Sequence, residues 1–126
     1  EIRIYYGASD WYFFDWRKGG LALATLDKNR WAGYEAINGI EPAVVTTIPM
    51  SLSNKIFISA DVQPQGSINV GILDKNGNKV MGFQTVTKSC TDLEITLKES
   101  VELSKTNKLR IQFILNYSKI YSFSIR

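Results

Sequence analysis

The sequence predicts an all-β fold, an antiparallel β-sandwich with a jelly-roll-like order of strands. Three observations support this fold class. Apolar and polar residues alternate over many short runs, as in residues 56–62, and a period of two is typical of strands with one buried face. Turn signals such as Asn76-Gly77 separate these runs. Only the segment 99–105 has the composition of a helix, and it offers a short turn at best.

The first strands are read from the N-terminus onward. Residues 1–6 (EIRIYY) have the composition of a strand from the start of the chain. An aromatic-rich loop follows and ends in Gly19-Gly20, after which Leu21-Ala22-Leu23 opens the next strand. Asn38-Gly39 is a turn signal between two further strands at 32–37 and 43–48.

The remainder of the chain carries the clearest alternation. Gln65-Gly66 separates two alternating runs, and Asn-Gly within 74–78 supplies the positive φ angles of a tight hairpin. In the run 56–62, Phe57, Ser59 and Asp61 are expected on the outward face. Ten strands are expected in all, near residues 2–7, 20–27, 32–37, 43–48, 55–62, 67–74, 79–86, 92–97, 109–116 and 119–125. Their inward faces predict a core of Ile56, Ile58, Ile68, Val70, Ile72, Ile95, Ile111, Phe113 and Phe123.

A chain of 126 residues is expected to form one domain, a single β-sandwich over 1–126. Residues 1–19 are assigned either to this sandwich or to the tail of a preceding domain or linker. Because the chain opens inside a strand, we expect it to be part of a longer protein.

Composition excludes several kinds of chemistry. The chain has no histidine, which removes Ser-His-Asp triads, Cys-His pairs and histidine-ligated metal sites. Cys90 is the one cysteine, so no internal disulfide forms, and no base accompanies it as a nucleophile would require. The carboxylates open to acid–base work are expected to be surface groups: Asp10, Asp15, Asp27, Glu35, Glu41 and Asp61. We therefore expect no catalytic residues and no enzyme activity in this chain.

Charge and hydropathy exclude two kinds of partner. The formal net charge is only +3 and the basic residues are scattered, which argues against nucleic acid. No apolar run approaches the roughly 18 residues that span a bilayer, so no membrane partner is expected.

One candidate for a metal site is the run Asp74-Lys75-Asn76-Gly77-Asn78, because it is similar to the start of a calcium-binding EF-hand loop. Thr85 stands where such a loop needs its glutamate, and we interpret the run as a turn. No cofactor is expected, although a structural Ca²⁺ elsewhere stays open.

The segment 11–16 is exceptional, because five of its six residues are aromatic. Such rings either cover protein or present a binding surface. Aromatic rings stack on the C–H faces of sugars while planar polar groups bind hydroxyls, which suggests a carbohydrate site. Its candidate residues are Trp11, Tyr12, Trp16, Arg17, Trp31, Asp15 and Asn116. In the alternative, these rings pack on a neighbouring domain or on the core.

The kind of sugar is suggested by basic residues near the tryptophans. Arg17, Lys18 and Arg30 favour an acidic or sulfated glycan, because a guanidinium pairs with a carboxylate or sulfate. Neutral glycans remain the alternative, since Arg17 can pair with Asp10 or Asp15 instead.

Residues 4–10 (IYYGASD), 16–26 (WRKGGLALATL) and 30–35 (RWAGYE) carry a family resemblance. Together they resemble a stretch of bacterial glycoside-hydrolase-like proteins in which a five-bladed propeller, related to the sucrose- and fructan-hydrolysing families, ends and a C-terminal β-sandwich follows. The later runs 56–61, 70–77 with 82–83, and 109–113 with 120–123 resemble strands of that sandwich. The loop 11–15 departs from the family, which commonly carries histidine there.

This resemblance implies a non-catalytic accessory module of a secreted, periplasmic or cell-surface bacterial carbohydrate-active enzyme. No catalytic residue carries over, because those of the family lie in earlier blades. One hypothesis is a carbohydrate-binding module that binds a poly- or oligosaccharide through its aromatics. The alternative is a structural β-sandwich that docks on the catalytic domain of the parent enzyme and completes its last blade. That alternative predicts an apolar patch formed by Ile2, Ile4, Tyr6 and the aromatic loop.

Overall fold

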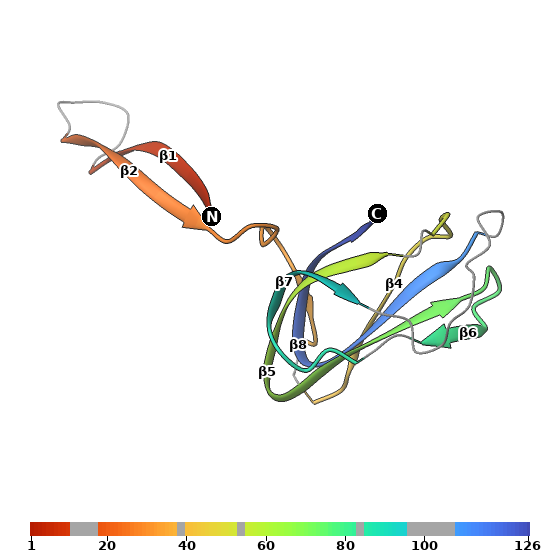
Figure 1. Ribbon diagram of the computed structural model, residues 1–126. Helices are drawn as coiled ribbons and strands as arrows, with labels where there is room; N and C mark the ends of the chain where they lie inside the picture. Colours follow the sequence, from red (N-terminus) through yellow and green to blue (C-terminus); the bar gives the residue numbers. More distant parts are fainter. Residues whose placement is uncertain (11–17, 38–39, 53–54, 83–84, 96–107) are drawn as a thin grey trace.

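A computed structural model describes residues 1–10, 18–37, 40–52, 55–82, 85–95 and 108–126, which form strands and connections and no helix (Figure 1). All strand pairs are antiparallel. The strands are β1 (Ile2–Ser9), β2 (Gly19–Leu26), β3 (Tyr34–Glu35), β4 (Ala43–Thr46), β5 (Ile56–Leu73), β6 (Lys79–Gly82), β7 (Cys90–Ile95) and β8 (Arg110–Ile125). The expected all-β class is confirmed, and the arrangement is that of a β-sandwich, whereas the jelly-roll order stays a prediction.

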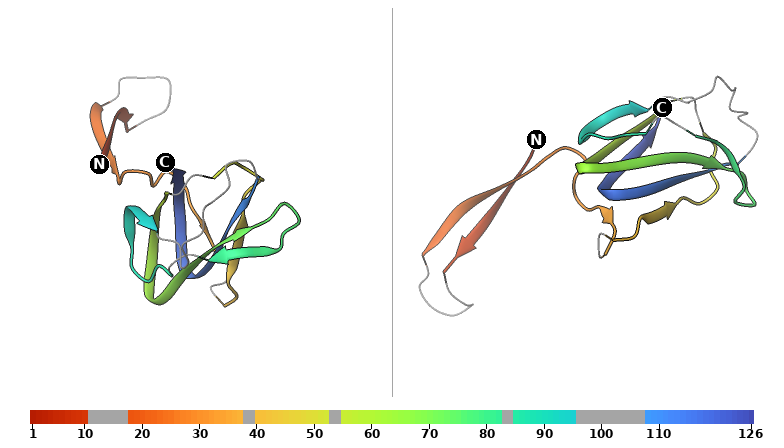
Figure 2. Two further views of the ribbon diagram at one scale, coloured as in Figure 1. Left: turned by 45° about the vertical axis from the view of Figure 1, so that its right-hand side comes forward. Right: turned by 90° about the horizontal axis from the view of Figure 1, so that it is seen from below.

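Two strands stand apart from the rest. β1 and β2 pair only with each other among the described strands, and their hairpin projects from the sandwich in every view (Figures 1 and 2). We call this hairpin, residues 1–10 and 18–26, the arm. Of residues 1–19, which the sequence set apart, the described ones hold β1 and the first residue of β2, and the paired strands end at Leu26.

The sandwich is organised by two long bent strands, β5 and β8, which pair along most of their length. Residues 56–62 of β5 pair with 118–125 of β8, and β7 and β3 extend this half of the sheet. Residues 67–73 pair with 110–116, and β6 and β4 extend the second half. One core cluster joins residues of both halves, so the two halves are the two layers of the sandwich.

The fold-over happens at a corner where the pairing of β5 with β8 is interrupted between Val62 and Ser67. Gln65 and Tyr117 both adopt left-handed backbone, with φ of 67° and 41°. Gly66 packs so closely here that a Cβ on it would lie 2.4 Å from the carbonyl oxygen of Tyr117. A bulge with positive φ on both strands bends them together, so one strand pair serves two layers.

Because β5 and β8 each run on through this corner as one strand, two expected pairs of strands merge. The runs 55–62 and 67–74 belong to β5, and 109–116 and 119–125 belong to β8. β3 covers only two residues of the expected 32–37. The helical candidate 99–105 lies outside the described residues.

The expected tight hairpin between β5 and β6 is confirmed. The Asp74 amide donates to the carbonyl of Asn78 at 2.9 Å, and Gly77 takes φ 91°. The Asp74 carboxylate accepts hydrogen bonds from the amides of Asn76 and Asn78 at 2.8 and 2.9 Å. These bonds lower the pKa of Asp74, with the Asn78 side chain contributing most. The carboxylate thus closes its own turn, as the turn interpretation predicts.

Eight of the nine expected core residues are buried, and Phe123 is the exception at 37% exposed. Its ring contacts Phe113, with centroids 5.5 Å apart, at the edge of the core. Ser59 was placed on the outward face, but it is buried. The pairing register shifts between Ser59 and Ala60, and this irregularity breaks the period of two. The Ser59 hydroxyl accepts a hydrogen bond from the Asp92 amide at 3.0 Å, which satisfies the buried oxygen.

Ile111→Ala is expected to lower the free energy of unfolding by about 2–5 kcal/mol, because Ile111 is fully buried between the layers and its truncation leaves a cavity. Chemical denaturation measures this loss. Val80→Ala, at an exposed position of β6, is the control and should change stability by less than about 0.5 kcal/mol. Equal stability of the Ile111 variant and the parent would contradict the assignment of the core.

Gly66→Ala is expected to destabilise the protein by about 1–3 kcal/mol, because backbone oxygens at the corner cannot move aside for the new methyl group. Gly71→Ala, in the same strand, is the matched control. Its Cβ would meet the Met81 carbonyl oxygen at 3.6 Å, an ordinary van der Waals distance. Thermal denaturation should rank Gly66→Ala well below Gly71→Ala, and the reverse order would show that the corner is not tightly packed.

Candidate functional site

The arm carries apolar side chains on both of its faces. Directly paired residues share a face of an antiparallel hairpin. One face therefore holds Ile2, Ile4, Tyr6 and Ala8 opposite Leu26, Ala24, Ala22 and Gly20. The other face holds Arg3, Tyr5, Gly7 and Ser9 opposite Thr25, Leu23, Leu21 and Gly19.

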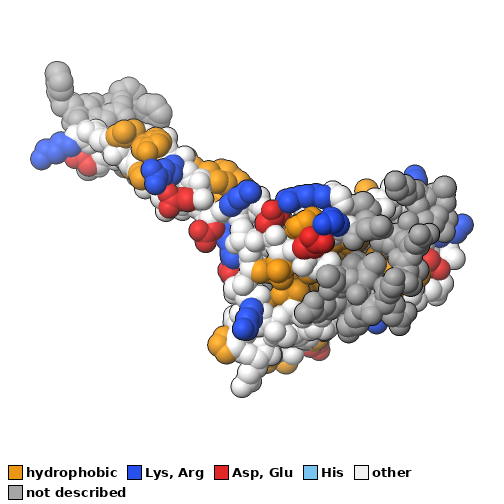
Figure 3. Space-filling view, in the orientation of Figure 1, with side chains coloured by type: hydrophobic (Ala, Val, Ile, Leu, Met, Phe, Trp, Pro, Cys, Tyr) orange, Lys and Arg blue, Asp and Glu red, His pale blue; other side chains and the backbone are white. Residues whose placement is uncertain are grey.

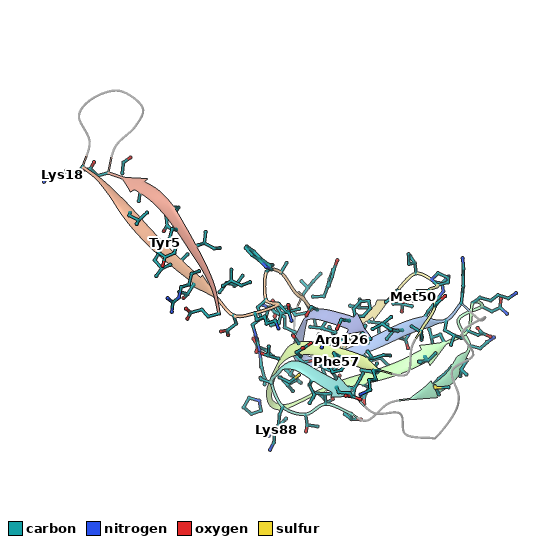
Figure 4. The ribbon with its side chains drawn as sticks, turned by 45° about the horizontal axis from the view of Figure 1, so that its top comes forward. Tyr5, Lys18, Met50, Phe57, Lys88 and Arg126 are labelled. Atoms are coloured by element: carbon teal, nitrogen blue, oxygen red, sulfur yellow. The ribbon has the colours of Figure 1, made fainter. Side chains whose placement is uncertain are left out.

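No described residue covers these faces. Tyr5 is 60% exposed and Leu21 is 78% exposed. Figure 3 shows apolar side chains along the arm, and in Figure 4 Tyr5 lies well away from Phe57 in the sandwich. A hairpin of two strands is marginally stable by itself in water. The apolar side chains on both faces of the arm are therefore left largely exposed by the described residues.

The arm joins the sandwich at a polar cluster built on Arg30, three residues after Asp27. Its Nη1 donates a hydrogen bond to Asp61 in β5, and its Nη2 donates to the Cys90 carbonyl at 3.4 Å. The hydroxyl of Tyr121 in β8 donates to the other Asp61 oxygen at 2.7 Å. The Arg30 guanidinium also lies over the Tyr121 ring, 4.8 Å from its centroid. Arg30 thus ties the segment behind the arm to three strands of the sandwich.

The charges of this cluster support one another. The hydrogen bond from Arg30, followed by that from Tyr121, holds the pKa of Asp61 below its usual value. The same carboxylate raises the pKa of Arg30 and, through its hydrogen bond, that of Tyr121. The Arg30 side chain is only 13% exposed, and its buried Nε has no hydrogen-bond partner among the described residues, with Asp27 at 3.8 Å. Arg30 is therefore an internal cation that is held in place.

Two cavities flank this cluster and share Asp61 and Tyr121. The first, which we call the root cavity, has a volume of about 410 Å³ and extends to the base of the arm at Glu1 and Asp27. The second, the sheet cavity, has a volume of about 270 Å³ and extends to Gln63 of β5. Its remaining lining residues are Glu35, Ser118 and Lys119.

The segment 30–35 runs between the two cavities, since Arg30 lines the root cavity and Glu35 lines the sheet cavity. Gly33 presses this segment onto β8, where an added Cβ would lie 2.9 Å from the Ile120 carbonyl oxygen. Two aromatic residues of the segment stay outside, Trp31 at 68% and Tyr34 at 69% exposed. Backbone contact at Gly33 thus holds this segment against β8, while the two rings stay exposed.

The described residues locate two of the seven candidate carbohydrate-binding residues. Trp31 is exposed in the segment that follows the arm, while Asn116 lies in the second half of the sheet, beyond the corner at Tyr117. The Asn116 amide donates to the Ser67 hydroxyl at 3.4 Å. The structure does not bring these two residues together. The other candidates, Trp11, Tyr12, Asp15, Trp16 and Arg17, lie outside the described residues.

Among the basic residues expected to attract an acidic glycan, Arg30 is engaged by Asp61. Lys18 is exposed at the far end of the arm, where its amide donates to the Asp10 carboxylate at 3.1 Å (Figure 4). These positions separate the two cations. The Arg30 guanidinium therefore cannot bind the carboxylate of a ligand without breaking its ion pair with Asp61.

Catalytic and metal chemistry find little support in the described part of the chain. Glu35 and Asp61 both line the sheet cavity, but Lys119 pairs with Glu35 at 2.9 Å and Arg30 with Asp61. Within the residues that the structure describes, no three of Cys, Asp and Glu converge as metal ligands would. Burial raises the pKa of the half-buried Cys90 thiol, which disfavours the nucleophilic thiolate.

No protein-family model, no curated protein and no solved structure matches this chain. A search of the described residues for a helix long and apolar enough to cross a membrane finds none. What defines the site is therefore its geometry, an uncovered arm joined to the sandwich by a charged cluster.

Sequence reasoning missed this cluster. Asp61 appeared only among candidate surface carboxylates, Tyr121 only as a member of the last strand, and Arg30 only as a ligand for a glycan. Their positions are 31 and 60 residues apart along the chain. No local pattern connects them, because the bends in β5 and β8 decide which residues meet.

Asp61→Asn is expected to lower the free energy of unfolding by about 1–2 kcal/mol near neutral pH, because the largely buried Arg30 loses its anion. The folded-state pKa of Asp61 is lowered, so the carboxylate contributes stability above its unfolded-state pKa of about 4. This contribution is lost as the pH falls through the folded-state pKa. The difference between parent and variant, measured by denaturation across pH, should therefore shrink in acid.

Asp27→Asn is the control, because Asp27 is mostly exposed and lies 3.8 Å from Arg30. It should change stability by less than about 0.5 kcal/mol. A difference between parent and Asp61→Asn that grows in acid would contradict the assigned ion pair.

Proposed function

We propose that this chain is a non-catalytic module that docks on a neighbouring β-sheet domain through its arm. The observation that carries the proposal is the arm itself, a two-stranded hairpin with apolar residues on both faces and no cover among the described residues. Strands that are buried on both faces are typical of the inside of layered β-structures. The arm therefore fits a partner that stacks on it from both sides.

The arm and the segment that follows it hold nearly half of the exposed large apolar residues. Among the described residues fifteen such side chains are exposed, and seven of them lie here: Ile4, Tyr5, Tyr6, Leu21, Leu23, Trp31 and Tyr34. Large exposed apolar areas mark interaction surfaces. The partner is therefore expected to cover the arm and the adjoining segment that contains Trp31 and Tyr34.

The edges of the arm suggest how the partner binds. β1 and β2 pair only with each other among the described strands, so each has one edge whose backbone groups are open to a further strand. Strand addition at such an edge supplies main-chain hydrogen bonds, which are sequence-tolerant and strong when buried. If the arm extends a β-sheet of the partner, the apolar faces of the arm become buried and the backbone groups at its edges gain hydrogen-bond partners.

The family resemblance suggests which partner this is. The arm coincides with residues 4–10 and 18–26, which resemble the end of a five-bladed propeller in glycoside-hydrolase-like proteins. A blade of such a propeller is a sheet stacked between two others. We therefore take the partner to be the catalytic propeller of a bacterial carbohydrate-active enzyme, which the arm completes. A secreted or cell-surface location follows from the same resemblance and is part of this proposal.

Docking is tested with a five-bladed propeller of this type produced as a separate chain. The parent chain is expected to form a one-to-one complex in which the amides of β1 and β2 become protected from hydrogen exchange. Ile4→Asp combined with Ala24→Asp places two charges on one face of the arm and should abolish the complex. Val80→Asp, an exposed apolar position on β6, is the matched control and should bind like the parent.

Two results would overturn the proposal. One is a double arm variant that binds the propeller as well as the parent does. The other is a parent chain whose arm amides become protected in the absence of the propeller, in a dimer that analytical ultracentrifugation detects. That result would make a second copy of this chain the partner instead.

A second candidate function, carbohydrate binding, is supported by a different observation. Trp31 presents a large ring to solvent, and it directly follows Arg30, which lines the root cavity. Exposed aromatic rings near polar groups are typical of sugar sites. In this proposal the module binds a poly- or oligosaccharide and holds the parent enzyme near its substrate. The aromatic residues of 11–16, which the sequence also offered as candidates, lie outside the described residues. Both functions would use Trp31, so a docked partner and a sugar would compete for this ring.

A further inference from the structure

We propose that β2 is the docking strand of the arm, and that an uncharged edge strand of the partner's β-sheet pairs with its open edge. This inference rests on the docking function proposed above. It adds which edge of the arm binds the partner and what kind of strand the partner offers.

The described strands at the edges of the sandwich each carry a feature that hinders further pairing. β3 has only two residues, and β4 has four and lies between Pro42 and Pro49. β6 also has four residues and begins at Lys79. β7 holds Asp92 in left-handed backbone, with φ 54°, at a shift in its register with β5. Short length, proline, charge and bulges are the features by which proteins keep the edges of sheets from pairing.

β2 has none of these features. It runs for eight residues, Gly19–Leu26, without a charge or a proline, and its register with β1 is unbroken over its whole length. Lys18 and Asp27, the nearest charges along the chain, lie beyond its two ends. Leu21 and Leu23 are 78% and 50% exposed. A long, regular and uncharged edge is a template for another strand, and main-chain hydrogen bonds supply the affinity of such pairing.

β1, the other strand of the arm, is less suited to this role. It is as long and as regular as β2, but it carries Arg3, which pairs with Glu1 at 2.7 Å at the base of the arm. A strand added to β1 would lie alongside this ion pair. A strand added to β2 meets only apolar residues and the hydroxyl of Thr25.

The side chains of β2 indicate what the partner strand presents. On the face of Ala22 and Ala24, β1 places the larger Tyr6 and Ile4 directly opposite. Because small residues pack best between large ones, the open side of Ala22 and Ala24 fits large apolar side chains as well. A charged side chain there would lose its hydration without gaining an ion pair. The partner strand is therefore uncharged, with large apolar residues on this face.

The inference is tested by hydrogen exchange, measured by NMR on the parent chain alone and in complex with the five-bladed propeller. In a regular antiparallel hairpin, every second amide of each strand points to the open edge. The outward-facing amides of β2 should slow on binding by at least about tenfold more than those of β1, because only they gain a hydrogen-bond acceptor.

The variants use proline, which removes one N–H group and is tolerated where that group points away from the paired strand. Directly opposite residues both point their amides inward or both outward, and adjacent pairs alternate. One of the pairs Ala8–Gly20 and Gly7–Leu21 therefore points outward, and exchange in the free chain identifies it. Gly20→Pro or Leu21→Pro, whichever belongs to that pair, should raise the Kd about tenfold or more.

The opposite residue of the same pair provides the matched control. Ala8→Pro or Gly7→Pro should leave the Kd within about threefold of that of the parent, because the amide it removes lies on the edge of β1. Leu21→Ala measures the loss that comes from the leucine side chain alone. Cross-strand contacts in the NMR spectra of each free variant show whether the hairpin is kept, and the exchange of the parent decides where it is not.

The outcomes separate the edge from the function. A complex in which the outward-facing amides of β1 slow as much as those of β2 overturns the assigned edge and leaves docking through the arm in place. A complex in which neither set slows does the same, since the partner then covers only the faces. The same measurement on the propeller locates the strand that pairs, and a charged residue within its paired run overturns the uncharged partner. A parent chain that forms no complex overturns the docking function and this inference with it.

Discussion

The close backbone contact at the corner of β5 and β8 is the constraint on which the rest of the structure depends. Gly66 lies against the carbonyl oxygens of Asn116 and Tyr117, at distances that exclude any side chain. Because both strands turn here together, two halves of one strand pair face each other and enclose a single core. The same bend sets which residues of β5 and β8 meet the N-terminal segment. Asp61 and Tyr121 lie on the same side of the corner and so converge on Arg30.

The junction of arm and sandwich joins surfaces of opposite character. The arm has apolar faces that gain from being covered, whereas the cluster around Arg30 is polar and is satisfied largely by its own partners. Cation–π contact with Tyr121 and hydrogen bonds to two backbone carbonyls hold Arg30 without help from a ligand. A similar arrangement secures the C-terminus, where Arg126 lies over Phe57 and binds both oxygens of Asp92 (Figure 4). Both arginines fasten chain segments at the margin of the sandwich, where hydrophobic burial is limited.

The two proposed functions meet at this junction. A partner domain that covers the arm lies next to the root cavity, because the cavity reaches Glu1 and Asp27 at the base of the arm. Trp31 and Tyr34 are exposed on the segment that follows the arm, so their rings are available to either proposed function.

The sequence by itself determined the β class, the tight turn at 74–78 and most of the core. These signals are local. Ile111 belongs to a run in which apolar and polar residues alternate, and Gly77 belongs to a short run of turn-forming residues. It did not determine the merging of four expected strands into β5 and β8, the burial of Ser59 or the exposure of Phe123, because register shifts and a corner interrupt the period of two. The candidate site was predictable only at Trp31. Only the tertiary structure brought Arg30, Asp61 and Tyr121 together and left the arm uncovered. Contacts between residues distant in the chain depend on where the long strands bend, and no short stretch of sequence encodes that position.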